Sequence, residues 1–313
     1  MKTSIKTAIY ALVARCVPDR FWGHLALTLG TLGALLRPRR ARGTANHLAR
    51  IIGDTRAPDM LAHAERDRAA ERMLSALLVH KLHDQPTFQP AVALRGKAHI
   101  DAALAQGRGA VLWSAQFHSA HVVEPLALHR AGIALHHLSR RDLGMNRAMA
   151  NRRWVDMAVA VEDRFLAERI VMDDDGAAAV LTLRQRLKDN GVVVVRALNL
   201  ARRVFELPFF DGRLRLAPGA LELAWATGAA VLPVFTIRSG ASAFRVHVEA
   251  PLAFGAKSDR KAAIEAAMID YAARLEAQVL AHPAQWNGWT NQASPAEPGG
   301  GAEVRVVPGR TPP

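Results

Sequence analysis

Four valines in a row, Val192 to Val195, constrain the fold of this chain more than any other feature. β-branched side chains stand on both sides of the strand that such a run forms, so both of its faces must be covered. Residues 177–189 before it have the apolar spacing of a helix, and Gly191 separates the two segments. A helix leading into a doubly buried strand is typical of a parallel sheet with helices on either side.

The same alternation continues through most of the chain. Apolar spacing predicts helices at residues 97–106, 120–130 and 220–226. Short apolar runs predict strands at residues 110–115, 134–138, 157–161 and 231–237, and residues 243–248 alternate as an edge strand would. We therefore predict an α/β fold with a largely parallel central sheet flanked by helices.

The strongly basic composition restricts the partners of the chain. The 313 residues carry a formal net charge of +13, which indicates an anionic bilayer, an acidic carrier protein or nucleic acid as partner. We find no zinc ligand set, no P-loop and no recognisable nucleic-acid-binding motif, so we expect no metal and no nucleic acid. One cysteine, Cys16, excludes an intramolecular disulfide and suits a reducing compartment.

An apolar segment near the N-terminus suggests contact with a membrane. Residues 21–36 contain no Asp, Glu, Lys or Arg, and Arg37, Arg39, Arg40 and Arg42 follow directly. The run is shorter than the roughly 20 apolar residues that span a bilayer. An apolar segment flanked by arginines suits a helical anchor in the interface of an anionic leaflet. The alternative is a helical hairpin that packs on the domain and leaves its arginines in solvent.

Several blocks of sequence occur in an order that resembles one protein family. They are residues 107–113, 204–212, 217–221, 226–235 and 274–286, the last ending in Pro283-Ala284-Gln285-Trp286. In this order they resemble the bacterial lipid A late (lauroyl/myristoyl) acyltransferases within the lysophospholipid acyltransferases, over about residues 10–290. On this basis we expect membrane-associating helices at residues 1–50, an α/β acyltransferase domain at residues 51–291 and a disordered tail at residues 292–313.

The resemblance implies a catalytic loop after the strand at residues 110–115. In the family this loop carries a histidine that takes a proton from the acceptor hydroxyl, and a carboxylate that orients the histidine. His118 and Glu124 are the matching residues, although five residues separate them where the family has four. His121 would share a helix face with Glu124 and is a second candidate. His137 and Asp142 have the family's spacing, but chance alone gives about one such pair, and they follow a later strand.

The resemblance also implies residues that bind the substrates. The family has a basic residue after the second strand that contacts the acceptor's phosphate, and Arg140 is its nearest counterpart. Arg152 and Arg153 could assist there. Where the family usually has an Asp-Gln pair, this chain has no acid; Asn199 could fill part of the position, and Arg202 and Arg203 could bind a phosphate or face solvent. The adjacent Phe209 and Phe210 are predicted to line an acyl groove.

We therefore expect a membrane-associated acyltransferase at the cytoplasmic face of the inner membrane. It would move a fatty acyl group from acyl carrier protein or acyl-CoA to a hydroxyl of a glycolipid, resembling a lipid A precursor, or of a lysophospholipid. The expected partners are an anionic membrane surface, acyl carrier protein and the lipid acceptor, with the acyl thioester as co-substrate and no other cofactor. The alternative is a catalytically inactive homologue that binds or escorts lipid or acyl chains.

Overall fold

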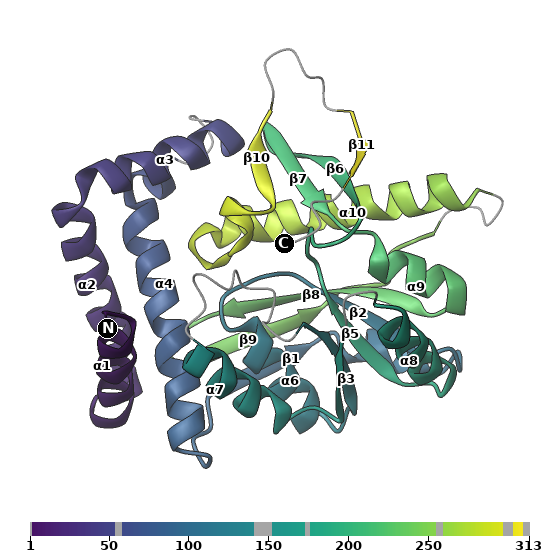
Figure 1. The fold of residues 1–313 in the computed structure, drawn as a ribbon, viewed down its shortest axis with the longest axis horizontal. Coiled ribbons are helices and arrows are strands. Elements are labelled where there is room, and N and C mark those ends of the chain that lie inside the picture. Colours follow the sequence, from purple (N-terminus) through teal and green to yellow (C-terminus); the bar gives the residue numbers. More distant parts are fainter. Residues whose placement is uncertain are drawn as a thin grey trace.

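The computed structural model describes residues 2–53, 58–140, 152–172, 176–254, 259–296 and 303–308. A seven-stranded sheet forms the centre of the fold (Figure 1). Its strands, in spatial order, are β1 (Ala91–Arg95), β9 (Ala243–Val248), β8 (Ala230–Arg238), β2 (Ala110–Ser114), β5 (Val192–Arg196), β3 (Leu135–Ser139) and β4 (Glu168–Val171). Neighbouring strands run parallel except β8 and β9, which are antiparallel.

Helices cover both faces of this sheet, which explains the buried valines of β5. Alternate residues of β2 point to opposite faces: Leu112 packs into one core cluster and Trp113 into the other. One face is covered by α5 (Lys97–Leu104), α6 (Ala120–Arg130) and α7 (Arg152–Asp163). The other is covered by α8 (Ala177–Lys188), α9 (Gly219–Thr227) and α10 (Arg260–Ala281). The predicted α/β fold with its mostly parallel sheet is confirmed.

Two of the predicted strands differ from the structure. The strand expected at residues 157–161 is wrong, because these residues lie in α7. Val155, Ala158 and Val161 are buried at helical spacing, which the short apolar run did not distinguish from a strand. The strand at residues 243–248 exists, but it is no edge strand: β1, which the sequence analysis missed, pairs with it in parallel.

Four helices precede the sheet and group along one side of it (Figure 1). They are α1 (Lys2–Cys16), α2 (Trp22–Leu36), α3 (Pro38–Ile52) and α4 (Pro58–Asp84), with a 3₁₀ turn at Asp19–Phe21. α2 packs on α4 through Trp22, Ala26 and Gly30; a Cβ at Gly30 would lie 2.6 Å from the carbonyl oxygen of Arg66. Over the described ranges, no helix is both long enough and apolar enough to cross a bilayer.

A second, four-stranded antiparallel sheet packs against α10. Its order is β10 (Ala293–Pro295), β7 (Gly212–Leu216), β6 (Arg203–Phe209) and β11 (Arg305–Pro308), and 3₁₀ turns at Pro283–Gln285 and Gly288–Thr290 lead into it (Figure 1). β10 and β11 lie in the segment that was expected to be a disordered tail, so that prediction needs correction. The β6–β7 hairpin offers unpaired backbone groups on both of its edges, and these two short strands pair with them.

Candidate active site

A cavity of about 830 Å³ lies at the carboxyl ends of β2, β3 and β5. This is the edge of a parallel sheet where substrates usually bind. Much of its wall is apolar and comes from α8, α9 and the loop after β5, including Val180, Leu183, Leu198, Leu200 and Leu223. A cavity of this size and character is large enough for an extended apolar chain.

Ionisable side chains line the polar part of the same cavity. They are the arginines Arg72, Arg140, Arg184 and Arg196, the histidines His118, His121 and His137, and Glu222. Among the described residues of the wall, Glu222 is the one carboxylate. The cavity is therefore suited to a ligand with an apolar chain and an anionic group.

The loop after β2 presents His118 to this cavity, and the segment at residues 283–286 holds the loop in place. The backbone N–H of His118 donates to the carbonyl of Gln285 at 2.8 Å, and Phe117 forms a β-bridge with Trp286. The Gln285 side chain in turn accepts from the N–H of Arg238 at 2.7 Å and donates to its carbonyl at 3.0 Å. The Pro-x-Gln-Trp block thus fixes the position of the predicted catalytic loop.

Arginines surround the imidazole of His118. Burial, followed by the charges of Arg72, Arg68 and Arg238, lowers the pKa of His118 from 6.5 to about 3. The ring is therefore neutral at pH 7. Within the part of the chain that the structure describes, no carboxylate bonds to this ring.

Glu124, the predicted partner of His118, is occupied elsewhere. Its fully buried carboxylate accepts a hydrogen bond from Ser114 Oγ at 2.5 Å and lies 3.2 Å from Nη1 of Arg196. Burial raises the pKa of Glu124, against the opposing effect of Arg196. Ser119 has a left-handed backbone with φ of 67°, and α6 starts after it. The structure does not bring the predicted His118–Glu124 pair together: His118 stays in the loop, while Glu124 turns toward the sheet.

A different histidine of the cavity has a carboxylate beside it. Nδ1 of His137, on β3, lies 2.7 Å from Oε1 of the buried Glu162, on α7. Arg169 on β4 donates to the second oxygen of Glu162 at 2.8 Å. Asp142, which has the family's spacing from His137, lies outside the described residues.

His121 interacts electrostatically with both His118 and His137. Its ring packs against Trp154 with a centroid separation of 5.9 Å, and its Nε2 is buried without a hydrogen bond among the described residues. Burial lowers the pKa of His121 to about 4, although the charge of Glu162 acts in the opposite direction. Like His118, this ring is neutral at pH 7.

The predicted substrate-binding residues are divided between the cavity and other places. Arg140 lines the cavity at the end of β3. Asn199 does not, but its amide donates to the carbonyl of Asn291, which is part of the wall. Arg202 is exposed and lies outside the lining, and Arg203 pairs with Glu222. The side chains of Arg152 and Arg153 lie outside the described part of the chain.

Phe209 and Phe210 do not line the cavity, which differs from the predicted acyl groove. Phe209 is fully buried 5.3 Å from Trp286, and Phe210 stacks on Trp289 at 6.3 Å. This aromatic cluster joins the β6–β7 hairpin to the segment after α10, and the N–H of Phe210 donates to Glu276 at 2.6 Å. The large apolar area of the two rings is used in the core, where it contributes to stability.

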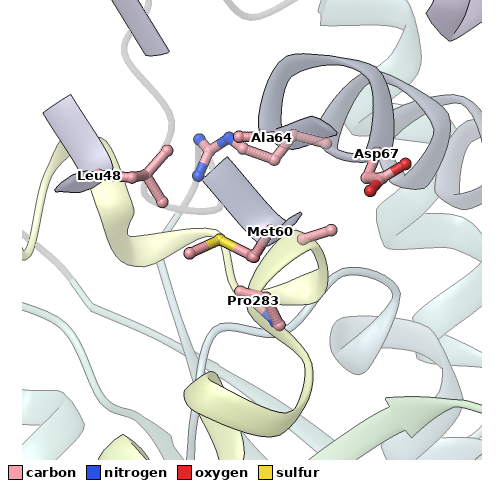
Figure 2. A pocket seen from close by; sticks show the side chains of 7 residues that line it. Leu48, Met60, Ala64, Asp67 and Pro283 are labelled. Carbon is pink, nitrogen blue, oxygen red and sulfur yellow. The ribbon is translucent and has the colours of Figure 1, made fainter. Parts of the chain in front are cut away.

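A second, small cavity lies between the N-terminal helices and the 283–284 segment (Figure 2). Its volume of about 30 Å³ matches a single water molecule, so it cannot hold an acyl chain. Figure 2 shows Leu48, Met60, Ala64, Asp67 and Pro283 around it. Arg68 also borders this cavity, and burial together with Arg72 lowers its pKa to about 10.

Sequence reasoning missed Glu162, Arg72 and Arg196 as parts of the site. Arg196 could have been predicted from the sequence, because it is the last residue of the valine-rich strand and therefore lies at the sheet edge where the substrate site was expected. Glu162 gave none, since it directly follows residues 157–161, which were wrongly predicted to form a strand. Over the described residues, no three His, Cys, Asp or Glu side chains form a group that could hold a metal ion.

Comparison with known proteins agrees with the resemblance seen in the sequence. The bacterial lipid A biosynthesis acyltransferase family matches residues 3–292. The phosphatidylinositol mannoside acyltransferase of Mycobacterium tuberculosis (strain ATCC 25618 / H37Rv) is 27% identical over 259 residues, which cover 77% of this chain and 73% of that protein. The chain therefore belongs to the bacterial lipid A biosynthesis acyltransferase family and is an acyltransferase of lipid biosynthesis.

Proposed function

We propose that this acyltransferase moves a fatty acyl group from a thioester to a hydroxyl of an anionic glycolipid. The observation that carries the proposal is the 830 Å³ cavity, which combines apolar walls with three histidines and four arginines. The apolar part suits the acyl chain, and the arginines suit phosphate groups. The name of the mycobacterial relative, which describes acylation of a phosphatidylinositol mannoside, supports a phosphorylated glycolipid as acceptor.

The acyl donor in this proposal is acyl carrier protein or acyl-CoA. Both are anionic, and the net charge of +13 favours their approach. Arg140, at the end of β3, is proposed to bind the phosphate of the acceptor, because a guanidinium binds phosphate oxygens in pairs. Arg184 and Arg72 add positive charge at other points of the same wall.

The proposed reaction needs one base. The acceptor oxygen attacks the thioester carbonyl, a new C–O bond forms, and the C–S bond breaks. The hydroxyl proton passes to a neutral imidazole and then to the departing thiolate. His118, the residue predicted from the sequence, lines the cavity and is neutral at pH 7, so its ring can accept that proton or donate a hydrogen bond to the thioester oxygen.

We further propose that the N-terminal helices bind an anionic membrane surface, at the cytoplasmic face of the inner membrane. Leu35 and Leu36 at the end of α2 are 70% and 80% exposed, and Leu12 on α1 is 62% exposed. Arg37 directly precedes α3, and Arg39, Arg40 and Arg42 lie on the exposed start of this helix. Among the described residues, Arg40 pairs with Glu65. Exposed leucines beside arginines can enter the interface while the cations remain at the headgroups.

An inactive lipid carrier is the second candidate function. It is favoured by one observation: Arg196, not His118, contacts Glu124, so the carboxylate that the family motif supplies cannot orient the predicted base. Such a protein would bind acylated lipid in the cavity and leave the thioester intact.

The two functions are separated by one assay. Purified protein is incubated with radiolabelled acyl carrier protein or acyl-CoA and total bacterial lipid extract. An enzyme forms a labelled lipid whose amount increases with time, and His118→Ala forms it at least about a hundredfold more slowly. Wild-type protein that forms no labelled lipid and hydrolyses no thioester, yet binds acylated lipid, would establish the carrier function instead.

A further inference from the structure

We infer that Arg238, the last residue of β8, is a positioning residue for the base His118. Its guanidinium holds Ser119, the residue directly after His118, and so fixes the direction in which the His118 side chain leaves the loop. This inference rests on the proposed acyl transfer. It keeps the base on the loop after β2 and adds a residue from a distant part of the chain that acts through this loop.

Ser119 is the residue of the loop that most needs to be held. Its backbone is left-handed, with φ of 67°, and the residue is 1% exposed. A left-handed backbone is unfavourable for any residue with a Cβ, and it persists only where neighbouring groups fix it. Ser119 is the N-cap residue of α6, yet its hydroxyl makes no capping hydrogen bond to the described helix. The hydroxyl instead accepts from Nη2 of Arg238 at 3.0 Å.

The guanidinium of Arg238 is itself fixed by acceptors on separate elements. Nε donates to the carboxylate of Glu71 on α4 at 2.9 Å, and Nη1 donates to the carbonyl of Ala241 in the turn after β8 at 2.8 Å. The group also lies over the ring of Phe244, 4.6 Å from its centroid. A guanidinium is planar with its donors in a rigid fork, so these contacts leave it one position. Ser119 is therefore held by a group that cannot easily shift.

The backbone of Arg238 holds the loop on the other side of the base. The side-chain amide of Gln285 bonds to both the N–H and the carbonyl of Arg238, at 2.7 and 3.0 Å. The backbone carbonyl of Gln285 then accepts from the N–H of His118 at 2.8 Å. Arg238 is thus connected to the N–H of His118 through Gln285, and to the next residue through its guanidinium.

Arg238 acts on the base from outside the cavity. His118 and Ser119 line the cavity, whereas neither Arg238 nor Glu71 is among the described residues of its wall. Arg238 therefore cannot touch the substrate. Its charge adds to the effect of its hydrogen bonds, because burial, then Arg72, Arg68 and Arg238, lower the pKa of His118. The result is a neutral ring with a fixed direction, as a general base requires.

A small displacement of this ring should be enough to slow the reaction. A base must lie about 2.6–3.2 Å from the hydroxyl that it deprotonates. A displacement of about 1 Å can cost a hundredfold in rate. Loss of the Arg238 side chain should therefore lower kcat. The KM for either substrate should change little, because Arg238 does not belong to the cavity wall.

The variants must separate the position of the base from the stability of the fold. Arg238→Gln alone leaves Glu71, whose side chain is 12% exposed, without its counter-charge, and this variant may fold poorly. We therefore include Arg238→Gln/Glu71→Gln, in which neither charge remains. In initial-rate assays of acyl transfer, this double variant should lose about ten- to a hundredfold in kcat, with KM within about threefold of wild type. Tm is measured for every variant.

Arg274 on α10 provides the matched control. It also joins a carboxylate to a backbone carbonyl, donating to Asp270 at 2.8 Å and to the carbonyl of Ala250 at 2.7 Å, and it lies outside the cavity wall. Arg274→Gln should therefore lower Tm and leave kcat within about threefold of wild type.

Ser119→Ala tests the path from Arg238 to the base. It removes the hydroxyl that Arg238 holds, and we expect it to lower kcat by about tenfold or more. If Arg238 acts through this hydroxyl, adding Ser119→Ala to Arg238→Gln/Glu71→Gln should cost less than about threefold more, because both changes break the same contact.

The possible outcomes separate this inference from the proposed function. Wild type that transfers no acyl group would refute acyl transfer itself. Active wild type, together with a folded Arg238→Gln/Glu71→Gln variant whose kcat is within about threefold of it, would refute only the role of Arg238. Losses in kcat that multiply in the triple variant, or a loss in Arg274→Gln as large as that in Arg238→Gln/Glu71→Gln, would also refute that role.

Discussion

The guanidinium of Arg196 lies 3.2 Å from the carboxylate of Glu124, between the end of β5 and the first turns of α6. Nη1 of Arg196 also donates to Ser114 Oγ at 2.6 Å, and the same hydroxyl donates to Glu124. β5 ends in this arginine, and no acid follows it where the family resemblance predicts one. Glu124, the carboxylate predicted to orient the base, is thus held in an ion pair with Arg196. Among the described residues, the cavity histidine with a carboxylate beside it is His137, next to Glu162.

Removal of Arg196 should destabilise the protein strongly. In Arg196→Ala the buried Glu124 loses its counter-charge, and we expect the free energy of unfolding to fall by about 3–5 kcal/mol. Urea denaturation followed by circular dichroism measures this change. The double variant Arg196→Ala/Glu124→Leu should recover a large part of it, because no buried charge remains.

The pair of exposed Arg203 and half-buried Glu222 is the control for that measurement. Arg203→Ala should cost less than about 1 kcal/mol, because solvent screens both groups. If Arg196→Ala were no more destabilising than Arg203→Ala, Glu124 would not depend on Arg196 for its stability.

Stability should fall as the solution becomes acidic, in part through two histidines. The folded-state pKa values of His118 and His121 are lowered, first by burial, to about 3 and about 4, whereas an unfolded histidine titrates near 6.5. Between these values the unfolded chain binds more protons, so stability is present above pH 6.5 and is lost as pH falls toward 4. Each group contributes at most about 1.4 kcal/mol per pH unit.

His121→Phe tests this dependence. It removes one titrating group and one buried nitrogen without a hydrogen bond, so the free energy of unfolding should vary less steeply between pH 6.5 and 4. Urea titrations at pH 7, 6 and 5 give the slope. The exposed His63→Phe should leave the slope as in wild type. If the free energy of unfolding of His121→Phe varied with pH as steeply as that of wild type, His121 would not contribute to the pH dependence as its burial implies.

Membrane binding should depend on both the leucines and the arginines of the N-terminal helices. Leu35→Gln/Leu36→Gln should weaken binding to anionic vesicles by at least about tenfold, because burial of each leucine contributes on the order of 1.5 kcal/mol or more. Replacement of Arg37, Arg39, Arg40 and Arg42 by Gln should weaken binding and flatten its salt dependence. Sedimentation with vesicles at several salt concentrations measures both effects.

Leu181 on α8 is the matched control, because it is 65% exposed but lies far along the chain from these helices. Leu181→Gln should bind vesicles as wild type does. Equal loss in Leu181→Gln and in the α2 variant would mean that no particular surface is responsible.

Arg140→Lys should affect the acceptor and not the donor. Lysine retains the charge but not the paired donors of a guanidinium, so we expect kcat/KM for the acceptor to fall by about tenfold. Hydrolysis of the acyl thioester in the absence of acceptor should remain at the wild-type rate. Arg202→Lys, outside the cavity wall, should behave as wild type in both assays. A wild-type rate for Arg140→Lys at limiting acceptor would remove Arg140 from the acceptor site.

The sequence by itself determined the fold class and many of the elements that carry the site. The helix predicted at residues 120–130 is α6, Ala120–Arg130, and the valine run is the core of β5. These elements could be predicted from the sequence because apolar spacing and β-branched runs are local properties of the chain. The strand order could not be predicted from the sequence. β1 and β9 are far apart in the chain and pair only in the folded protein, so the alternating residues of β9 did not indicate that another strand lies beside them.

The tertiary structure alone decided which charges meet in the cavity. Sequence spacing suggested His118 with Glu124, or His137 with Asp142, because motif reasoning pairs residues that are close in the chain. In the folded protein Glu124 meets Arg196 from β5, and His137 meets Glu162 from α7. A buried carboxylate needs a counter-charge or donors within about 4 Å. Strand order and helix orientation determine which group comes within that distance.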